Sequence, residues 1–135
     1  MDIAQLRDVI TTLLSASPNL IGTYRLPDNS TIPAVYVVGQ KSVPSDWKVI
    51  GLEVTMRQYP ALLPTPAIGV VDVLQEWEVM LVQYNPDGKE IASAMDRMTR
   101  RFPDADFRYL PGDDVAYERC RIIIPDREIR RLITS

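Results

Sequence analysis

The stretch that decides the fold is WEVMLVQY (77–84), which runs through NPDG (85–88) into KEIASAMDRMTRRFP (89–103). Residues 77–84 alternate in the manner of a strand, with Trp77, Val79 and Leu81 on one face. The helix that follows carries an apolar stripe at helical spacing, formed by Ile91, Met95, Met98 and Phe102. We therefore expect a sheet strand backed by an amphipathic helix, with Trp77 and the stripe in the core.

The remaining elements are predicted on both sides of this unit. Asp2 and Gln5 have capping-box spacing, so a first helix is expected to begin there and to end before Pro18. Turn residues separate the predicted strands, which cover residues 20–26, 31–39, 49–57, 73–84, 106–110 and 117–124. The order α-β-β-β-β-α-β-β predicts an α+β fold of two layers, a mostly antiparallel sheet flanked by two helices, in a single domain over residues 1–135.

Two strands carry more specific expectations. Pro33 cannot donate a ladder hydrogen bond, so its end of the second strand is expected at a sheet edge or at the strand's start. In residues 49–57 the apolar positions alternate with Glu53, Thr55 and Arg57. This alternation predicts a half-buried strand whose polar face meets solvent.

Residues 58–72 (QYPALLPTPAIGVVD) are apolar but contain Pro60, Pro64 and Pro66. The prolines predict irregular structure, and two interpretations are open. The segment is either a loop folded over its own core or an arm that docks on a neighbouring subunit, because an apolar irregular segment left in water promotes aggregation. Residues 125–135 are predicted to form a short C-terminal tail.

The composition excludes several kinds of chemistry. Among 135 residues there is no histidine and one cysteine, Cys120, so a Cys–His or Ser–His pair and a Cys-rich zinc site are impossible. Cys120 alternates with Ile122 and Ile124, which predicts a core position. The net charge of −3 is not typical of a nucleic-acid binder, and no Gly-rich phosphate loop is present. No apolar run reaches the ~18 residues that a membrane span needs, and the N-terminus does not resemble a secretory signal.

Carboxylates offer an alternative. Asp113, Asp114 and Glu118 cluster near a turn, and PDREIR (125–130) resembles part of a metal-dependent nuclease pattern but ends on Arg130 where that pattern has lysine. A metal-dependent nuclease or resolvase of a mobile element is therefore one alternative function. A small α+β ligand-binding module is another. The expectation from the residues is nevertheless no catalytic residue, no metal and no cofactor.

The segment order resembles a known family. An amphipathic N-terminal helix precedes PAVYVVG (33–39) and IGLEVTM (50–56), and EWEVMLVQY (76–84) leads into EIASAMDRMTRRF (90–102). The chain then continues through DFRYL (106–110) and YERCRIIIP (117–125). Over residues 2–125 this is similar to the tail-terminator and tail-completion (head–tail joining) proteins of long-tailed bacteriophages.

That resemblance implies a structural role and not an enzyme. It implies a homo-hexameric ring that caps the tail tube, stops its polymerisation and contacts the neck or connector proteins and, in a contractile tail, the sheath. DNA would pass through only as cargo and no membrane would be bound. The protein would reside in the virion tail or neck, and in the host cytoplasm during assembly.

The residues expected to serve this role fall into two sets. The subunit interface is predicted to use the apolar segment and the arginines: Tyr59, Leu62, Leu63, Ile68, Arg97, Arg100, Arg101 and Arg130. For the arginines of the second helix, a solvated face is the simpler interpretation and contact with an acidic patch of another copy is the functional one. Glu76 and Glu78 are predicted to give the ring an acidic lumen, which would not grip passing DNA.

Overall fold

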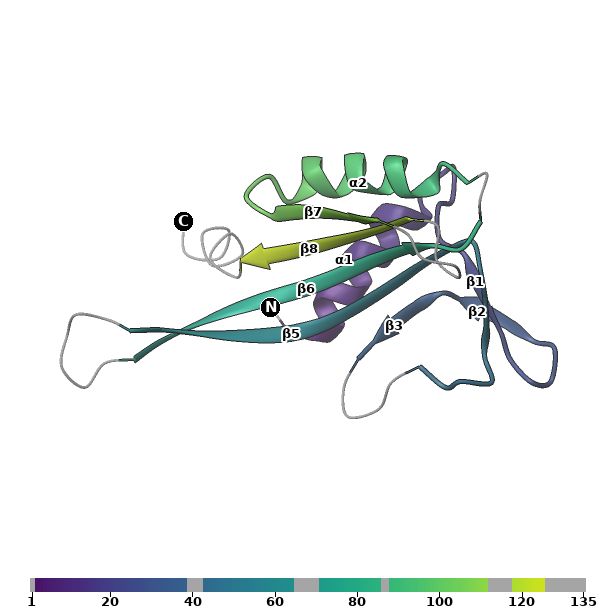
Figure 1. Cartoon of the computed structure of the whole chain (residues 1–135), viewed down its shortest axis with the longest axis horizontal. Helices are drawn as coiled ribbons and strands as arrows, with labels where there is room; N and C mark the ends of the chain where they lie inside the picture. The colour runs from purple at the N-terminus through teal and green to yellow at the C-terminus, as the bar shows by residue number, and fades with distance from the viewer. Residues whose placement is uncertain (1, 39–42, 65–70, 86–87, 112–117, 126–135) are drawn as a thin grey trace.

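The computed structural model describes residues 2–38, 43–64, 71–85, 88–111 and 118–125, and only the backbone of residues 59–64, 71–75 and 111. This part of the chain contains two helices and eight strands, which confirms the α+β class (Figure 1). The elements in chain order are α1 (Ile3–Ser15), β1 (Thr23–Arg25), β2 (Thr31–Pro33), β3 (Val35–Val37), β4 (Lys48–Ile50), β5 (Leu52–Pro64), β6 (Val71–Gln83), α2 (Glu90–Arg101), β7 (Asp106–Pro111) and β8 (Glu118–Pro125).

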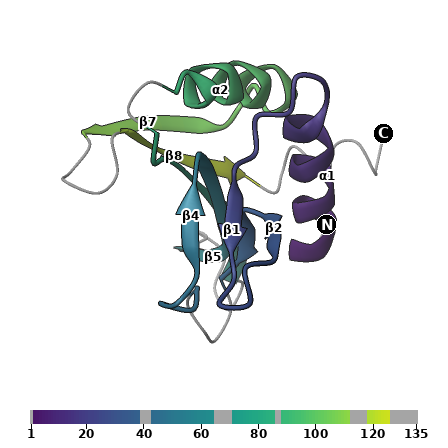
Figure 2. The ribbon, with the colours of Figure 1, turned by 90° about the vertical axis from the view of Figure 1, so that its right-hand side faces the viewer.

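The strands form two sheets. The larger has the order β3-β5-β6-β8-β7 and is antiparallel except for the β3–β5 pair. The smaller has the order β2-β1-β4 and is antiparallel throughout. Figure 2 looks onto the small sheet, with α1 beside it and α2 over the β7–β8 side of the large sheet. Pro33 lies in β2, an edge strand of the small sheet, as predicted.

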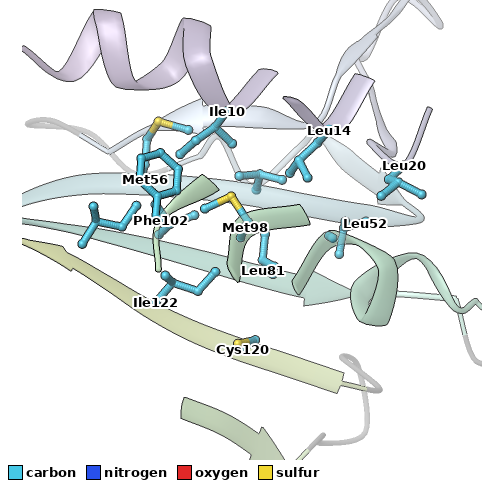
Figure 3. Packing of buried hydrophobic residues seen from close by; sticks show 14 of the residues in the cluster. Ile10, Leu14, Leu20, Leu52, Met56, Leu81, Met98, Phe102, Cys120 and Ile122 are labelled. Atoms are coloured by element: carbon cyan, nitrogen blue, oxygen red, sulfur yellow. The ribbon is translucent and has the colours of Figure 1, made fainter. Parts of the chain in front are cut away.

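Both helices pack on one face of the large sheet. Leu6, Ile10 and Leu14 of α1 are fully buried, and the Asp2–Gln5 capping box that starts this helix is present. The α2 stripe is confirmed, with Met95 partly buried and its other three residues fully buried. Figure 3 shows side chains of both helices pointing onto the strands that carry Met56, Leu81 and Ile122. Trp77, only 1% exposed, and Cys120 belong to the same core, as predicted.

Two predicted strands are each divided between the sheets. The segment 31–39 breaks at Ala34 into β2 and β3, and the segment 49–57 breaks at Gly51 into β4 and β5. Gly51 has a φ of 85°, a left-handed conformation that glycine adopts at little cost. Gly22 lies against this joint, donating to the Leu52 carbonyl at 2.8 Å and accepting from the Ala34 amide at 3.0 Å. The two sheets are therefore connected twice by a continuous chain.

Candidate functional site

The β5–β6 hairpin is the longest feature of the fold and projects past the end of β8 (Figure 1). Its two strands pair from Leu52–Gln83 out to Pro64–Val71. Their neighbours are shorter, because β3 pairs only with residues 54–56 of β5 and β8 only with residues 76–83 of β6. Residues 60–64 and 71–75, which we call the distal ribbon, therefore pair only with each other within the described chain. At 3.4 Å per residue the distal ribbon is about 17 Å long.

The prediction of irregular structure over residues 58–72 was wrong for the described part of that segment. Residues 58–64 lie in β5 and residues 71–72 in β6, while residues 65–70, with Pro66, lie outside the described chain. The Val54 amide and the Met56 carbonyl bond toward β3, so even-numbered residues of β5 direct their backbone groups away from β6. Pro60 and Pro64 are even-numbered, and the N–H that each lacks would have faced away from the hairpin. Both prolines are thus tolerated without the loss of a hydrogen bond to β6.

The predicted interface residues of this segment are brought together only in part. Tyr59, Leu62 and Leu63 lie along β5, the first beside Glu76 and the other two in the distal ribbon. Ile68 and Arg130 lie outside the described chain. The interface role of all five positions stays a prediction.

Arg97 has a role within the subunit that the sequence did not predict. Its guanidinium donates to the carbonyls of Leu13 (3.1 Å), Leu14 (3.3 Å), Ala16 (3.1 Å) and Pro18 (2.9 Å). These carbonyls end α1 and the turn after it, where a helix leaves its last acceptors unpaired. The last turn of α1 has no basic residue of its own. Arg97 therefore caps α1 and joins it to α2.

The other two arginines of α2 remain on the surface. Arg100 forms an i,i+4 ion pair with Asp96 at 3.0 Å, and its side chain is 79% exposed. Arg101 is exposed and stands 5.1 Å from the centre of the Phe102 ring. Both side chains are accessible to a partner, as an interface role requires. That role stays a prediction for Arg100 and Arg101.

The two carboxylates predicted to line a lumen differ in environment. Glu78 has a side chain only 9% exposed and accepts from Arg57 at 2.9 Å and from Arg121 at 3.1 Å. Burial opposes ionisation of Glu78, but the hydrogen bonds from Arg57 and Arg121 outweigh it and hold the pKa of this carboxyl below its usual range. Glu76 is half-buried and makes no ion pair within the described chain. Of the two, Glu76 has the more accessible negative charge.

This geometry predicts a pH-dependent contribution to stability. A lowered folded pKa means that the Glu78 carboxylate stabilises the fold above its ordinary pKa near 4.5, and that this contribution is lost as the pH falls through the folded value. We expect Glu78→Gln to lower the free energy of unfolding by about 1–2 kcal/mol at neutral pH, at the low end because the Arg57 side chain is 49% exposed and the Arg121 side chain 32% exposed. The variant should also lose less stability than the wild type between about pH 5 and pH 3. Urea unfolding across that range measures both effects, and Glu76→Gln is the control that should behave like the wild type.

The polar face of β5 was predicted to meet solvent, but part of it is buried. Glu53 is only 7% exposed and accepts from the Tyr24 hydroxyl at 2.7 Å and from the Tyr84 hydroxyl at 3.4 Å. Burial, and then the hydrogen bond to Glu53, raise the pKa of Tyr24 well above its usual value, so this hydroxyl stays a donor. Tyr24 belongs to the small sheet and packs on Trp47, with ring centroids 5.5 Å apart. No sequence signal showed that the small sheet would cover this part of the face.

The potential reactive groups are few in the described chain. Cys120 is fully buried, and burial raises the pKa of its thiol, which disfavours the reactive thiolate. Among the described residues no group of three Cys, Asp or Glu could hold a metal ion. Asp113 and Asp114, on which the nuclease alternative rests, lie outside the described chain.

Comparison with protein-family models, with curated proteins and with solved structures gives no match. No helix in the described residues has the length and apolar character to cross a bilayer.

Proposed function

We propose that this protein is a structural subunit of a virion, a tail terminator that forms a hexameric ring, caps the tail tube and joins it to the neck. The observation that carries the proposal is the projecting hairpin. A two-stranded ribbon is marginally stable in water without a third strand or a packing surface. A subunit that extends such a ribbon beyond its own sheet is suited to contact a neighbour.

Three further points support an assembly role. The order of segments resembles that of tail-terminator proteins. The chain has no histidine, and its one cysteine is buried. It therefore lacks the side chain that most often acts as a general base, and its thiol is not accessible as a nucleophile. Arg100 and Arg101 stand exposed on α2, while the half-buried carboxylate of Glu76 lies on another element. Complementary charges on different surfaces suit head-to-tail contacts within a ring.

The mass in solution tests this proposal. Light scattering on a size-exclusion column, over a range of concentrations and with purified tail tubes added, should give a species of six times 15.3 kDa, alone or at tube ends. Negative-stain images should show rings. A stable dimer under all conditions, or a monomer that never binds tube ends, would contradict the proposal.

A further inference from the structure

The small sheet (Figure 2) is lightly packed compared with the large one. Its three strands have three residues each, and Tyr24 is the one residue among them that is buried. Ile32 and Val49 lie directly opposite Tyr24 on either side, yet Ile32 is 38% exposed and Val49 is half-buried. None of these strand residues belongs to the described core that joins both helices to the large sheet, whereas β8 alone supplies three fully buried side chains to it. Elements with few buried apolar contacts open most readily.

A tightly bonded joint separates the small sheet from the large one. Gly22 donates to the Leu52 carbonyl at 2.8 Å and accepts from the Ala34 amide at 3.0 Å. The Gly51 carbonyl accepts from the Tyr84 amide at 2.8 Å. Leu52 lies in β5 and Tyr84 directly follows β6, so these bonds anchor the joint to the large sheet. The joint is therefore the boundary at which a local opening of the small sheet stops.

Beyond the joint, the small sheet is held down through Tyr24. The Tyr24 hydroxyl donates to Oε2 of Glu53 at 2.7 Å, and this is the side-chain hydrogen bond that links the two sheets in the described chain. Trp47, which precedes β4, packs against Tyr24 with ring centroids 5.5 Å apart and against Tyr36 of β3 at 6.2 Å. A hydrogen bond to a buried carboxylate is stronger than one between neutral groups. Tyr24 thus makes the specific contact that keeps the small sheet closed.

We propose that the small sheet opens as one unit from the folded large sheet, with the Tyr24–Glu53 hydrogen bond as its latch. In the closed form, Glu53 is hidden beneath Tyr24. In the open form, Glu53 joins Thr55 and Arg57, which alternate along the same face of β5 and are already half-buried and exposed, respectively. Opening therefore adds a negative charge to the surface that β5 shows to a partner, while the core stays intact. This motion lies within one subunit and is independent of the proposed ring.

Amide hydrogen exchange of the full-length chain, read by mass spectrometry, tests the opening. In the wild type, the amides of β1, β2 and β4 should exchange together, roughly tenfold or more faster than those of β6 and β8. Tyr24→Phe removes the latch hydroxyl. It should raise exchange in the small sheet by roughly tenfold or more, since a hydrogen bond to a charged group is lost. Exchange in β6 and β8 should stay within a few-fold of the wild type.

Tyr84→Phe is the matched control. The Tyr84 hydroxyl also donates to Glu53, at 3.4 Å, but Tyr84 directly follows β6, so this bond does not join the two sheets. The control variant should leave exchange in the small sheet within a few-fold of the wild type. Three outcomes would overturn the proposal: equal protection of both sheets in the wild type, an equal rise in both variants, or a rise after Tyr24→Phe that spreads to β6 and β8.

Tryptophan fluorescence gives an independent readout of the latch. The chain has two tryptophans, and Trp77 is only 1% exposed, so acrylamide quenching reports mainly on Trp47. Tyr24→Phe should make Trp47 easier to quench, and Tyr84→Phe should not. Unchanged quenching in the Tyr24→Phe variant would show that the small sheet stays closed without this hydroxyl, and the latch would be refuted.

Discussion

Replacing Gly22 with alanine is expected to destabilise the fold by about 3 kcal/mol or more, at the upper end of overpacking effects. A Cβ at this position would overlap the backbone carbonyl oxygen of Ile50 and lie 2.6 Å from the Leu52 nitrogen. These are main-chain atoms on either side of Gly51, where β4 leaves the small sheet and β5 enters the large one. They cannot move without disturbing both sheets.

Chemical denaturation measured by circular dichroism checks this prediction, and Gly88→Ala is its control. The nearest atoms to a Cβ at Gly88 would belong to the side chains of Gln83 and Glu90 and not to the main chain, so they can shift without moving a strand. The Gly88→Ala variant should therefore lose clearly less free energy of unfolding than the Gly22→Ala variant. Equal losses would show that the joint between the sheets is not specially tight.

Removing the guanidinium of Arg97 should be the second large effect. Arg97→Ala takes four hydrogen bonds from carbonyls at the end of α1 and is expected to cost about 2–3 kcal/mol, less than the sum of four charged bonds because the group is partly solvated. Arg97→Lys should recover only part of the loss, because an ammonium has three donors and lacks the planar fork. Amide hydrogen exchange should rise first in α1.

Arg100→Ala provides the matched control for this experiment. It lies one turn further along α2, and its exposed pair with Asp96 contributes a few tenths of a kcal/mol. If Arg97→Ala were as mild as Arg100→Ala, the capping role of Arg97 would be refuted.

Much of the large sheet and both helices were predictable because their signals are local. The alternation from Trp77 to Leu81 and the stripe from Ile91 to Phe102 each report one buried face of one element. The breaks at Ala34 and Gly51 left no such signal, since the period of two continues through them while the chain changes sheets. The burial of Glu53 depends on Tyr24, which is 29 residues away.

The candidate site was less predictable for a related reason. Proline in a sequence predicts the loss of a hydrogen bond between strands. Which of the two neighbouring strands loses that bond depends on the register of the pairing, which the sequence does not reveal. In the register of this hairpin, the side that lacks the N–H of Pro60 and Pro64 faces away from β6, so both prolines fit within β5. The partners of Arg97 lie 79 to 84 residues earlier in the chain, a separation at which sequence pattern carries no information about contact.

Because of that separation, the contacts of α1 become available only late during synthesis of the chain. The helix α1 is made well before α2, so the guanidinium that bonds the carbonyls at the end of α1 does not exist until residue 97 has been added. Its apolar face packs on β3, β5 and α2, and α2 is the last of these to be made. During synthesis α1 therefore waits for a later segment, and until α2 has been made part of its apolar face is open to chaperones and proteases.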